Sequence, residues 1–279
     1  GLGGAATVVG GSNYMIRAAG AVVGGWQNRA VVVNPGCDID LFAPVKKDAD
    51  AVPTVGFIGK LLAAKGTHLF LAALGKTTAS GLRAVVVGDG SFGSPLHELT
   101  RALRSGDRDG ALEVATRGDG DPLDDLVAFL SSRSADEDYF RRLAEVAVEF
   151  TGHLEHRPLA RLLPTLDVLV VPSVVPEAFG MVAAEAAACG VLPVVPDHSG
   201  IAEAGRAVED ALGMPGLLVY DPGDPIAGIA AAVDRILARP AEDRQRMGQA
   251  AAALARERWS WEQVSDRLLQ LALRGAGPR

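Results

Sequence analysis

Short runs of β-branched residues recur along the whole chain, and an alanine-rich or amphipathic stretch follows most of them. This alternation of strand and helix signals predicts repeated βα units and therefore an α/β fold with a parallel sheet. Several runs are apolar at every position, which is typical of strands that helices cover on both faces. The predicted strands are 29–35, 54–59, 83–88, 148–150, 167–173, 192–196 and 216–221. The predicted helices lie near 66–79, 95–105, 157–164, 179–189, 200–211, 224–238, 241–256 and 260–272.

Composition excludes several classes of function. The net charge of −7 argues against a nucleic-acid partner, which requires a basic surface. Apolar runs such as that at 166–176 are broken by Pro, Ser or a charge before about 18 residues, so no membrane-spanning helix is expected. Two cysteines, Cys37 and Cys189, are too few for a disulfide framework and favour a reducing, cytoplasmic setting.

Two stretches interrupt the βα rhythm. Residues 37–53 form a polar, Pro-containing connection, and the strand–helix–strand expected before it is too short to be a domain. Residues 91–146 hold twelve acidic residues against seven arginines. We expect a solvated helical insertion there, with one or two surface helices in its tail, rather than an acidic lid. The expected division is 1–43 as the remnant of a preceding domain plus connector, 44–259 as the main domain, and 260–279 as a closing helix and tail.

A glycine-rich turn follows the predicted strand 83–88. Its spacing, G-x-G-x-x-G at Gly88, Gly90 and Gly93, is typical of dinucleotide binding when a strand precedes it and a helix follows. The acidic residue that such a site needs about 20 positions later should end a second strand, whereas Asp107 lies in the turn SGDRDG. A dinucleotide-dependent oxidoreductase therefore stays a secondary hypothesis.

Two lysines follow the preceding predicted strand. Gly59 ends that strand, Lys60 and Lys65 come next, and Gly66-Thr67 begins a helix. Because α/β sheets bind ligands at the carboxyl ends of their strands, both ammonium groups are candidates for holding an anion. The spacing is not that of a P-loop, in which the lysine directly follows the second glycine.

The segment 176–190, PEAFGMVAAEAAACG, holds two glutamates among small and apolar residues. A carboxylate in such surroundings needs a partner, and the hydroxyl groups of a ligand would serve for Glu177 and Glu185. Glu177 lies just before the predicted helix, whose first backbone N–H groups, from Phe179 to Val182, would offer an anion site. With the lysines opposite, the pattern indicates a site for a diphosphate flanked by sugars.

These residues resemble the E-x7-E motif of the retaining GT-B glycosyltransferases grouped as family 4. The resemblance continues in register over roughly residues 29–272. VVVNPGCDIDLF is similar to the connector between the two halves of these enzymes, GKLLAAKG to their basic loop and RAVVVGDG to their glycine turn. VEFTGHLEHRPLARLLPTLDVLVVPS is similar to their F-x-G segment with the next strand, and WSWEQVSDRLLQLAL to their closing helix. The resemblance implies the Rossmann-like C-terminal half, which binds the sugar donor.

The resemblance also implies roles for individual residues. Glu177 would contact the donor sugar and Glu185 the nucleotide ribose, while Lys60 and Lys65 would bind the donor diphosphate. Glu177, Lys60 and Lys65 are thus the expected catalytic residues. The further donor-binding residues would be Gly59, Gly88, Gly152, His153, Leu154, Phe179, Gly180, Met181 and Val182. The expected substrate is a UDP- or GDP-linked sugar, transferred with retention of the anomeric configuration and without a metal ion or other cofactor.

Several features depart from the family pattern. Lys60 stands where Arg is usual, Ala178 replaces a Gly, NPG at 34–36 replaces NG, and the 91–146 insertion exceeds the usual spacer. The chain starts at Gly1 without an initiator Met. We expect that the acceptor-binding half would precede it, together with any peripheral membrane contact, and that the fragment alone is inactive. A non-catalytic nucleotide-sugar-binding module is the remaining alternative.

Overall fold

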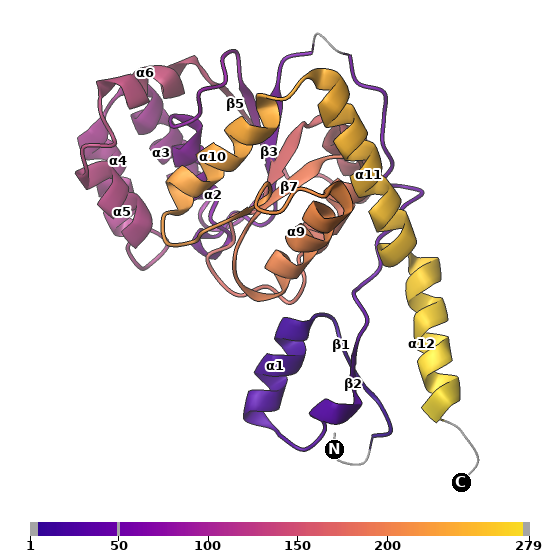
Figure 1. Cartoon of the computed structure of the whole chain (residues 1–279). Coiled ribbons are helices and arrows are strands. Elements are labelled where there is room, and N and C mark those ends of the chain that lie inside the picture. Colours follow the sequence, from indigo (N-terminus) through magenta and orange to yellow (C-terminus); the bar gives the residue numbers. More distant parts are fainter. Residues whose placement is uncertain (1–4, 49–50, 276–279) are drawn as a thin grey trace.

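A six-stranded parallel sheet forms the centre of the structure, a computed structural model that describes residues 5–48 and 51–275 (Figure 1). The strand order is β5-β4-β3-β6-β7-β8, so the chain builds one half outward from β3 and then crosses back to build the other half outward from β6. The strands are β3 Thr54–Ile58, β4 Arg83–Val87, β5 Ala147–Gly152, β6 Val168–Val170, β7 Leu192–Pro196 and β8 Val219–Tyr220. The parallel α/β sheet predicted from the sequence is confirmed.

Helices cover both faces of this sheet. Helices α2, α3 and α10 pack together on one face, and α8, α9 and α11 pack together on the other, as right-handed crossovers from the two halves require. Strands β3, β6 and β7 are buried at every position, as their continuous apolar runs indicate. The helices of the main domain are α2 Thr67–Leu74, α3 Gly93–Ser105, α4 Arg108–Arg117, α5 Asp124–Ser131, α6 Glu137–Glu145, α7 His156–Leu162, α8 Met181–Ala188, α9 Ser199–Leu212, α10 Pro225–Leu237 and α11 Ala241–Trp259, with short 3₁₀ turns at Ala63–Lys65 and Leu163–Thr165.

The acidic stretch 91–146 folds into α3 to α6, so its tail has three helices where one or two were expected. These helices are amphipathic and extend the core. Tyr139 of α6 is fully buried, and its hydroxyl donates a hydrogen bond to the Ala72 carbonyl of α2 at 3.1 Å. Phe129 of α5 packs edge-on against the same ring, with 5.0 Å between centroids. The stretch is therefore joined to the main domain through apolar contacts, while most of its charged side chains are exposed.

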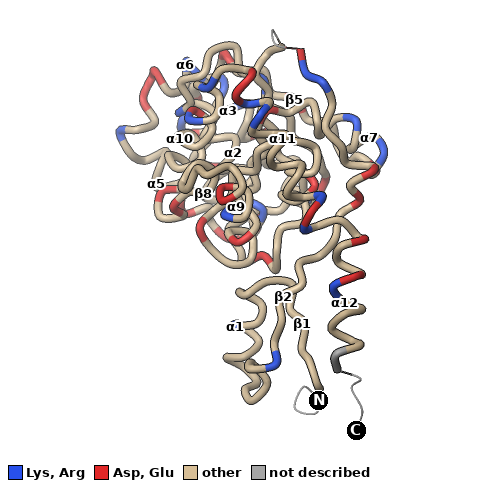
Figure 2. The backbone as a smooth tube through the Cα atoms, turned by 45° about the vertical axis from the view of Figure 1, so that its right-hand side comes forward, with Lys and Arg blue, Asp and Glu red and all other residues tan. Residues whose placement is uncertain are grey.

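A small N-terminal unit lies beside the main domain (Figure 1). It consists of β1 Val8–Gly10, α1 Asn13–Val22, a 3₁₀ turn at Gln27–Arg29 and β2 Ala30–Val32, and its two strands pair in parallel. The unit is attached through Glu203 of α9, whose carboxylate accepts the backbone N–H groups of Asn13 and Tyr14 at 2.9 and 2.7 Å. An acidic group there also complements the dipole of α1. The unit is almost free of charged residues (Figure 2).

The C-terminal helices frame the connection between the two parts. Helix α11 ends at Trp259, whose carbonyl accepts the Cys37 N–H at 2.7 Å, so the connector is tied to the end of α11. Helix α12, Trp261–Gly275, then extends away from the sheet in the same direction as the N-terminal unit (Figure 1). None of the helices in the described residues is long and apolar enough to cross a lipid bilayer.

One predicted helix is much shorter in the structure. The helix expected at 66–79 ends at Leu74, and Gly75 caps it. A Cβ at Gly75 would lie 2.5 Å from the ring of Tyr139, so the chain turns away at the point where α6 crosses it. The sequence does not show this crossing, because Tyr139 is 64 residues further along the chain.

Gly66 provides a test of the contact between the loop after β3 and the end of β6. Its φ is 73°, and a Cβ there would lie 1.9 Å from the Pro172 carbonyl oxygen. Gly81 has a similar φ of 65° with nothing within 4 Å, so it is a matched control. We expect Gly81→Ala to cost about 1–2 kcal/mol of unfolding free energy for the left-handed backbone alone. Gly66→Ala should cost roughly 3 kcal/mol or more in urea denaturation, and equal losses for the two would contradict this close contact.

Candidate functional site

A pocket of about 620 Å³ lies at the carboxyl ends of β3 and β6. The strand order reverses between these two strands, and this is the place where open α/β sheets bind ligands. Both halves of the domain supply its wall, together with Pro35 from the connector. The lining residues are Pro35, Phe57, Ile58, Gly59, Lys60, Lys65, Val171, Ser173, Glu177, Ala178, Phe179, Gly180, Met181, Val182 and Glu185.

Glycines hold the loops on the β3 side of this pocket close together. The Gly59 N–H donates to the Val87 carbonyl at 3.0 Å, and the Gly88 N–H donates to the Gly152 carbonyl at 2.9 Å. Gly88 has a φ of 139°, and a Cβ there would lie 1.8 Å from the Gly59 carbonyl oxygen. The glycine turn after β4 is therefore packed against the loop after β3. Asp107, the acid considered for a dinucleotide site, caps α4 by accepting the Gly110 N–H at 2.9 Å.

An ion pair joins the two sides of the pocket. The Lys65 ammonium lies 2.5 Å from Oε1 of Glu177, and the Ser173 hydroxyl donates to the same oxygen at 2.8 Å. Both charged side chains are partly buried, so solvent screens this pair less than a surface pair. Oε2 of Glu177 has no hydrogen-bond partner among the described residues. One carboxylate oxygen is thus fixed by the protein, while the other is left for a ligand.

The backbone of Glu177 is held by the turn that follows β7. Its N–H donates to the Ser199 hydroxyl oxygen and its carbonyl accepts the Gly200 N–H, both at 2.9 Å. A Cβ at Gly200 would lie 2.0 Å from the Ala178 carbonyl oxygen, so only glycine allows this approach. Sequence reasoning assigned no role to Ser173, Ser199 or Gly200, because only the fold shows that they contact Glu177.

Helix α8 begins at Met181, two residues later than the helix predicted at 179–189. The reason is Gly180, which has a φ of 92° and lies before the first helical turn. Phe179 is buried and packs edge-on against Trp259 of α11, with 5.5 Å between ring centroids. No side chain caps α8, so its first N–H groups, those nearest the pocket, are available to an anion.

Glu185 lies on the pocket side of α8, one turn into the helix. The residue is half-buried, and its carboxylate makes no hydrogen bond or ion pair within the described part of the chain. Burial raises the pKa of its carboxyl group, and the charge of nearby His156 opposes this rise only in part. An unpaired, partly buried carboxylate destabilises a folded protein, so its presence in the pocket indicates a ligand-binding role.

The predicted site residues are only partly gathered in this pocket. Lys60 lines it and is exposed, in accord with a charge that faces a ligand. Gly88, Gly152, His153 and Leu154 do not line it, because they lie at or just after the ends of β4 and β5, which are one and two strands away from β3. His153 is exposed and lies 3.4 Å from Glu155. A role of these four residues in donor binding stays a prediction.

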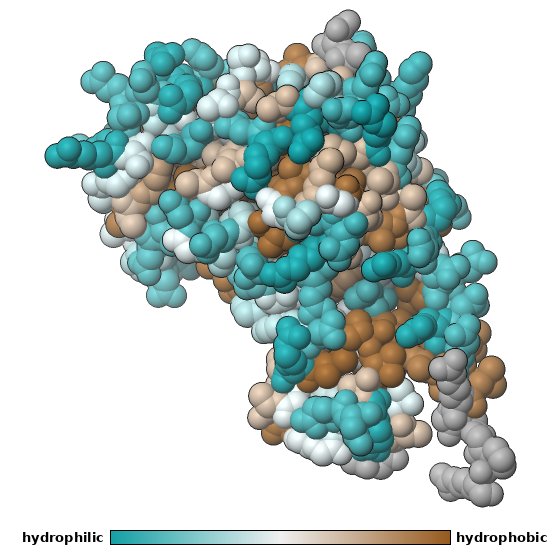
Figure 3. Space-filling model, viewed as in Figure 1, coloured by the Kyte–Doolittle hydropathy of each residue, from teal (hydrophilic) through white to brown (hydrophobic). Residues whose placement is uncertain are grey.

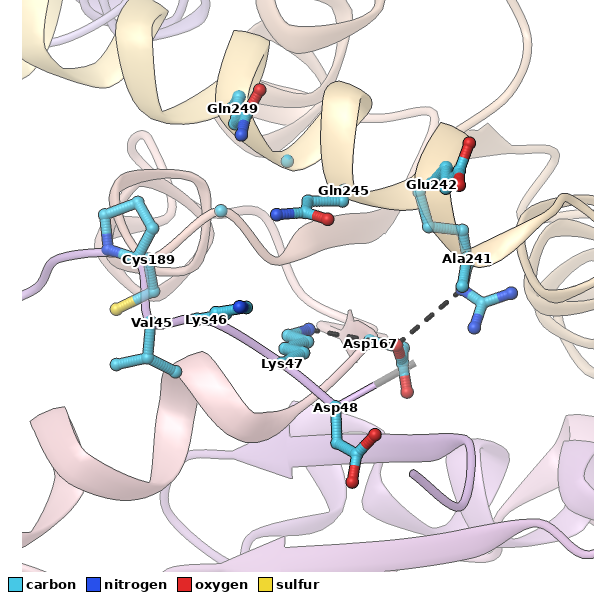
Figure 4. Close-up of a pocket in the computed structure, with 14 residues that line it drawn as sticks. Val45, Lys46, Lys47, Asp48, Asp167, Cys189, Ala241, Glu242, Gln245 and Gln249 are labelled. Carbon is cyan, nitrogen blue, oxygen red and sulfur yellow. Dashed lines mark ion pairs between the residues drawn. The ribbon is translucent and has the colours of Figure 1, made fainter. Parts of the chain in front are cut away.

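A second pocket, of about 420 Å³, lies at the opposite, amino ends of the strands (Figure 4). Asp167 lies 3.8 Å from the Lys47 ammonium and 3.7 Å from Nε of Arg244, and it accepts the Thr54 N–H at 2.9 Å. Figure 4 shows Lys47 of the connector facing Asp167, with Gln245 of α11 on the other side. Arg244 also donates to the carbonyls of Leu237 and Arg239. These ion pairs and hydrogen bonds hold the connector to the amino end of the sheet.

Comparison with known proteins shows which proteins this chain is similar to. The family described as Glycosyl transferases group 1 matches residues 140–254. D-inositol 3-phosphate glycosyltransferases of Mycobacterium bovis and Mycobacterium tuberculosis are 32% identical over 257 residues, which is 89% of this chain but 44% of theirs. The chain therefore spans less than half the length of these relatives.

Solved structures share the fold. Anabaena Alr3699/HepE, in complex with UDP and glucose, superposes with a TM-score of 0.65 at 20% identity, over 96% of this chain and 63% of that one. Sucrose-phosphate synthase from Thermosynechococcus elongatus gives a TM-score of 0.63 at 23% identity, over 98% and 59%. The Rossmann-like architecture with helices on both faces is therefore confirmed.

Replacing Glu185 should make the free protein more stable in a pH-dependent way. Because its pKa is higher in the folded than in the unfolded state, the ionised carboxylate lowers stability above the folded-state pKa and has no effect once it is protonated in both states. We expect Glu185→Gln to raise the thermal midpoint by roughly 1–3 °C at pH 7.5 and not at pH 4. Differential scanning fluorimetry across this pH range measures the difference in thermal midpoint between the variant and the wild type. If the carboxylate had a partner, this difference would be the same at both pH values or would change sign.

Proposed function

We propose that this chain binds the nucleotide-sugar donor in a retaining sugar transfer. The sequence matches and the fold support a C-terminal GT-B glycosyltransferase domain. The observation that carries the proposal is the convergence of Lys60, Lys65, Glu177 and Glu185 on one pocket at the switch point of the sheet. Two cations and two carboxylates, the latter eight positions apart, match the alternation of anionic and hydroxyl groups in such a donor.

The donor diphosphate would lie between the two lysines and the start of α8. Lys60 and Lys65 supply positive charge from the β3 side, and the first N–H groups of α8 supply hydrogen-bond donors and the positive end of the helix dipole. Negative charge grows on the diphosphate as the sugar leaves. Preorganised donors at that position stabilise the transition state more than the ground state, which is what accelerates the reaction.

The donor sugar would contact Glu177. Its free Oε2 can accept hydrogen bonds from sugar hydroxyl groups, while Ser173 holds Oε1 in place. Lys65 now pairs with Oε1, and a bound diphosphate would share its ammonium group. Glu177 and Lys65 thus support each other in the free site and act on adjacent parts of the donor when it binds.

The nucleoside would contact Glu185. Its carboxylate has no partner of its own and lies deeper along α8, where ribose hydroxyl groups would satisfy it. Solved structures of the similar Anabaena protein hold UDP and UDP-glucose, which supports a nucleotide-sugar as the ligand and a uridine nucleotide as the first probe. The proposed donor is therefore a UDP- or GDP-linked sugar.

The acceptor would bind on a second half of the enzyme. Apolar residues gather between the N-terminal unit and the main domain and next to α12 (Figure 3). Trp261, Leu269 and Leu273 of α12 are large apolar side chains that are exposed. Exposed apolar surface of this kind is typical of an interface. We infer that an acceptor-binding half covers it, in agreement with relatives more than twice as long as the matched region.

Thermal shift with UDP, GDP, ADP and NAD(H) tests the proposal, because a ligand that binds only the folded state raises the midpoint. We expect one nucleoside diphosphate to stabilise the wild type, with a rise of a few degrees at a concentration of about 100 times Kd. Glu185→Ala should lose most of this rise, measured from its own unliganded midpoint. Glu113→Ala, which alters an exposed acid on α4, should keep it.

The outcomes separate the functional classes. A shift with NAD(H) that survives Glu185→Ala would contradict the proposal and favour an oxidoreductase. The absence of any shift would contradict donor binding by this chain alone. Binding of donor without sugar transfer, after the acceptor-binding half is supplied, would favour a non-catalytic module.

A further inference from the structure

Ser199, the first residue of α9, has an unusual backbone conformation. Its φ is 55°, and it is the one non-glycine residue of the described chain with a positive φ. Side chains disfavour this left-handed region, and residues that adopt it tend to cluster at functional sites. Ser199 lies directly behind the candidate site, since its hydroxyl oxygen accepts the Glu177 N–H at 2.9 Å. Glycine would adopt this φ without strain, because the strain comes from Cβ; what serine adds at this position is the hydroxyl group that contacts Glu177.

The preceding residue, His198, connects this hydroxyl to the other end of the same loop. Its Nε2 lies 2.9 Å from the Ser173 carbonyl oxygen, and its Nδ1 lies 3.0 Å from the Ser199 hydroxyl oxygen. A carbonyl can only accept, so Nε2 carries the hydrogen, and Nδ1 of the neutral imidazole accepts the hydrogen of Ser199. The Ser199 oxygen in turn accepts from Glu177. Every donor and acceptor of this chain of hydrogen bonds is then matched.

The imidazole thereby spans the two ends of the loop that carries Glu177. After β6 ends at Val170, this loop runs from Ser173 through the exposed residues Val174 and Val175 to Glu177, ahead of α8. His198 holds the Ser173 backbone directly and the Glu177 backbone through Ser199. Ser173 also donates its own hydroxyl to Oε1 of Glu177. Both the backbone and the carboxylate of Glu177 therefore depend on one buttress, formed by His198 and Ser199.

We infer that Ser199 and His198 are positioning residues that aim the free oxygen of Glu177 at the donor sugar. The inference rests on the proposed function, because it takes Glu177 as the group that contacts the sugar. His198 and Ser199 have no contact with the donor diphosphate in this arrangement, in which Lys60, Lys65 and the start of α8 bind it. Loss of the buttress should therefore weaken recognition of the sugar and leave recognition of the nucleoside diphosphate intact.

Ser199→Gly tests this inference, because it removes the hydroxyl group and relieves the backbone at the same time. We expect a thermal midpoint within about 2 °C of the wild type or above it. The measured quantity is the Kd for a nucleoside diphosphate divided by the Kd for its sugar conjugate, both from calorimetry. The ligand pairs are UDP with UDP-glucose, UDP with UDP-N-acetylglucosamine, and GDP with GDP-mannose. The advantage of the preferred sugar conjugate should fall by about tenfold, while Kd for the nucleoside diphosphate stays within twofold.

A second readout needs no ligand. The Glu177 amide should exchange its hydrogen at least tenfold faster in Ser199→Gly than in the wild type, because its acceptor is gone. Amides in the core strand β6 serve as internal controls, since their exchange reports overall stability. His198→Gln is a second variant. His198→Gln keeps an amide donor and an acceptor in place of the two ring nitrogens but not their fixed geometry, so it should give the same changes with a smaller effect.

The two readouts separate the possible failures. Unchanged Glu177 exchange together with an unchanged sugar advantage would overturn the buttress. If the wild type binds no nucleotide, the proposed function fails. If it binds the sugar conjugates no better than the nucleoside diphosphates, the role of Glu177 fails. In both cases, hydrogen exchange at the Glu177 amide still decides whether the buttress holds its backbone. An equal loss of sugar and diphosphate binding would overturn the assignment, since that result indicates a general collapse of the pocket.

Discussion

The close approach of the loops that follow β3 and β6 is the constraint on which the site depends. The two strands are neighbours in the sheet although their first paired residues, Val55 and Val168, are 113 positions apart in the sequence, so only the tertiary fold brings their carboxyl ends together. Gly66 permits the contact, because a larger residue would meet the Pro172 carbonyl oxygen. Because of this contact, the Lys65 ammonium lies 2.5 Å from Oε1 of Glu177, so a cation from one loop meets a carboxylate from the other.

The site differs from the core around it in how its charges are satisfied. The buried carboxylate of Glu209 in the core, for example, accepts the N–H groups of Leu218 and Val219 at 2.7 and 2.8 Å. At the pocket, one oxygen of Glu177 and the whole carboxylate of Glu185 lack partners among the described residues. Protein interiors rarely leave such groups unpaired, because the free energy lost when a polar group leaves water is recovered only if the group forms a hydrogen bond in the protein. The unpaired groups are what a hydroxyl-rich ligand would complete.

The sequence predicted the sheet well for a physical reason. Strands β3, β6 and β7 are buried on both faces, so nearly all of their residues are apolar or small, and such runs are visible without a structure. The resemblance to GT-B glycosyltransferases, confirmed by the comparisons, rests on local motifs that survive divergence. The tail of the 91–146 stretch was less well predicted, because its helices gain their stability from packing against α2 and against one another rather than from local propensity.

The sequence by itself determined the parallel α/β fold and the chemical character of the site, since the strands are continuous apolar runs and Lys60, Lys65, Glu177 and Glu185 stand in recognisable local contexts. Only the tertiary structure decided which oxygen of Glu177 is held and which is free, because Ser173, Ser199 and Gly200 reach that residue from different strand ends. It also decided that α8 begins at Met181 and that His153 and Leu154 lie outside the main pocket. Hydrogen bonds between distant segments depend on distances of a few tenths of an ångström, and no local pattern in the chain encodes them.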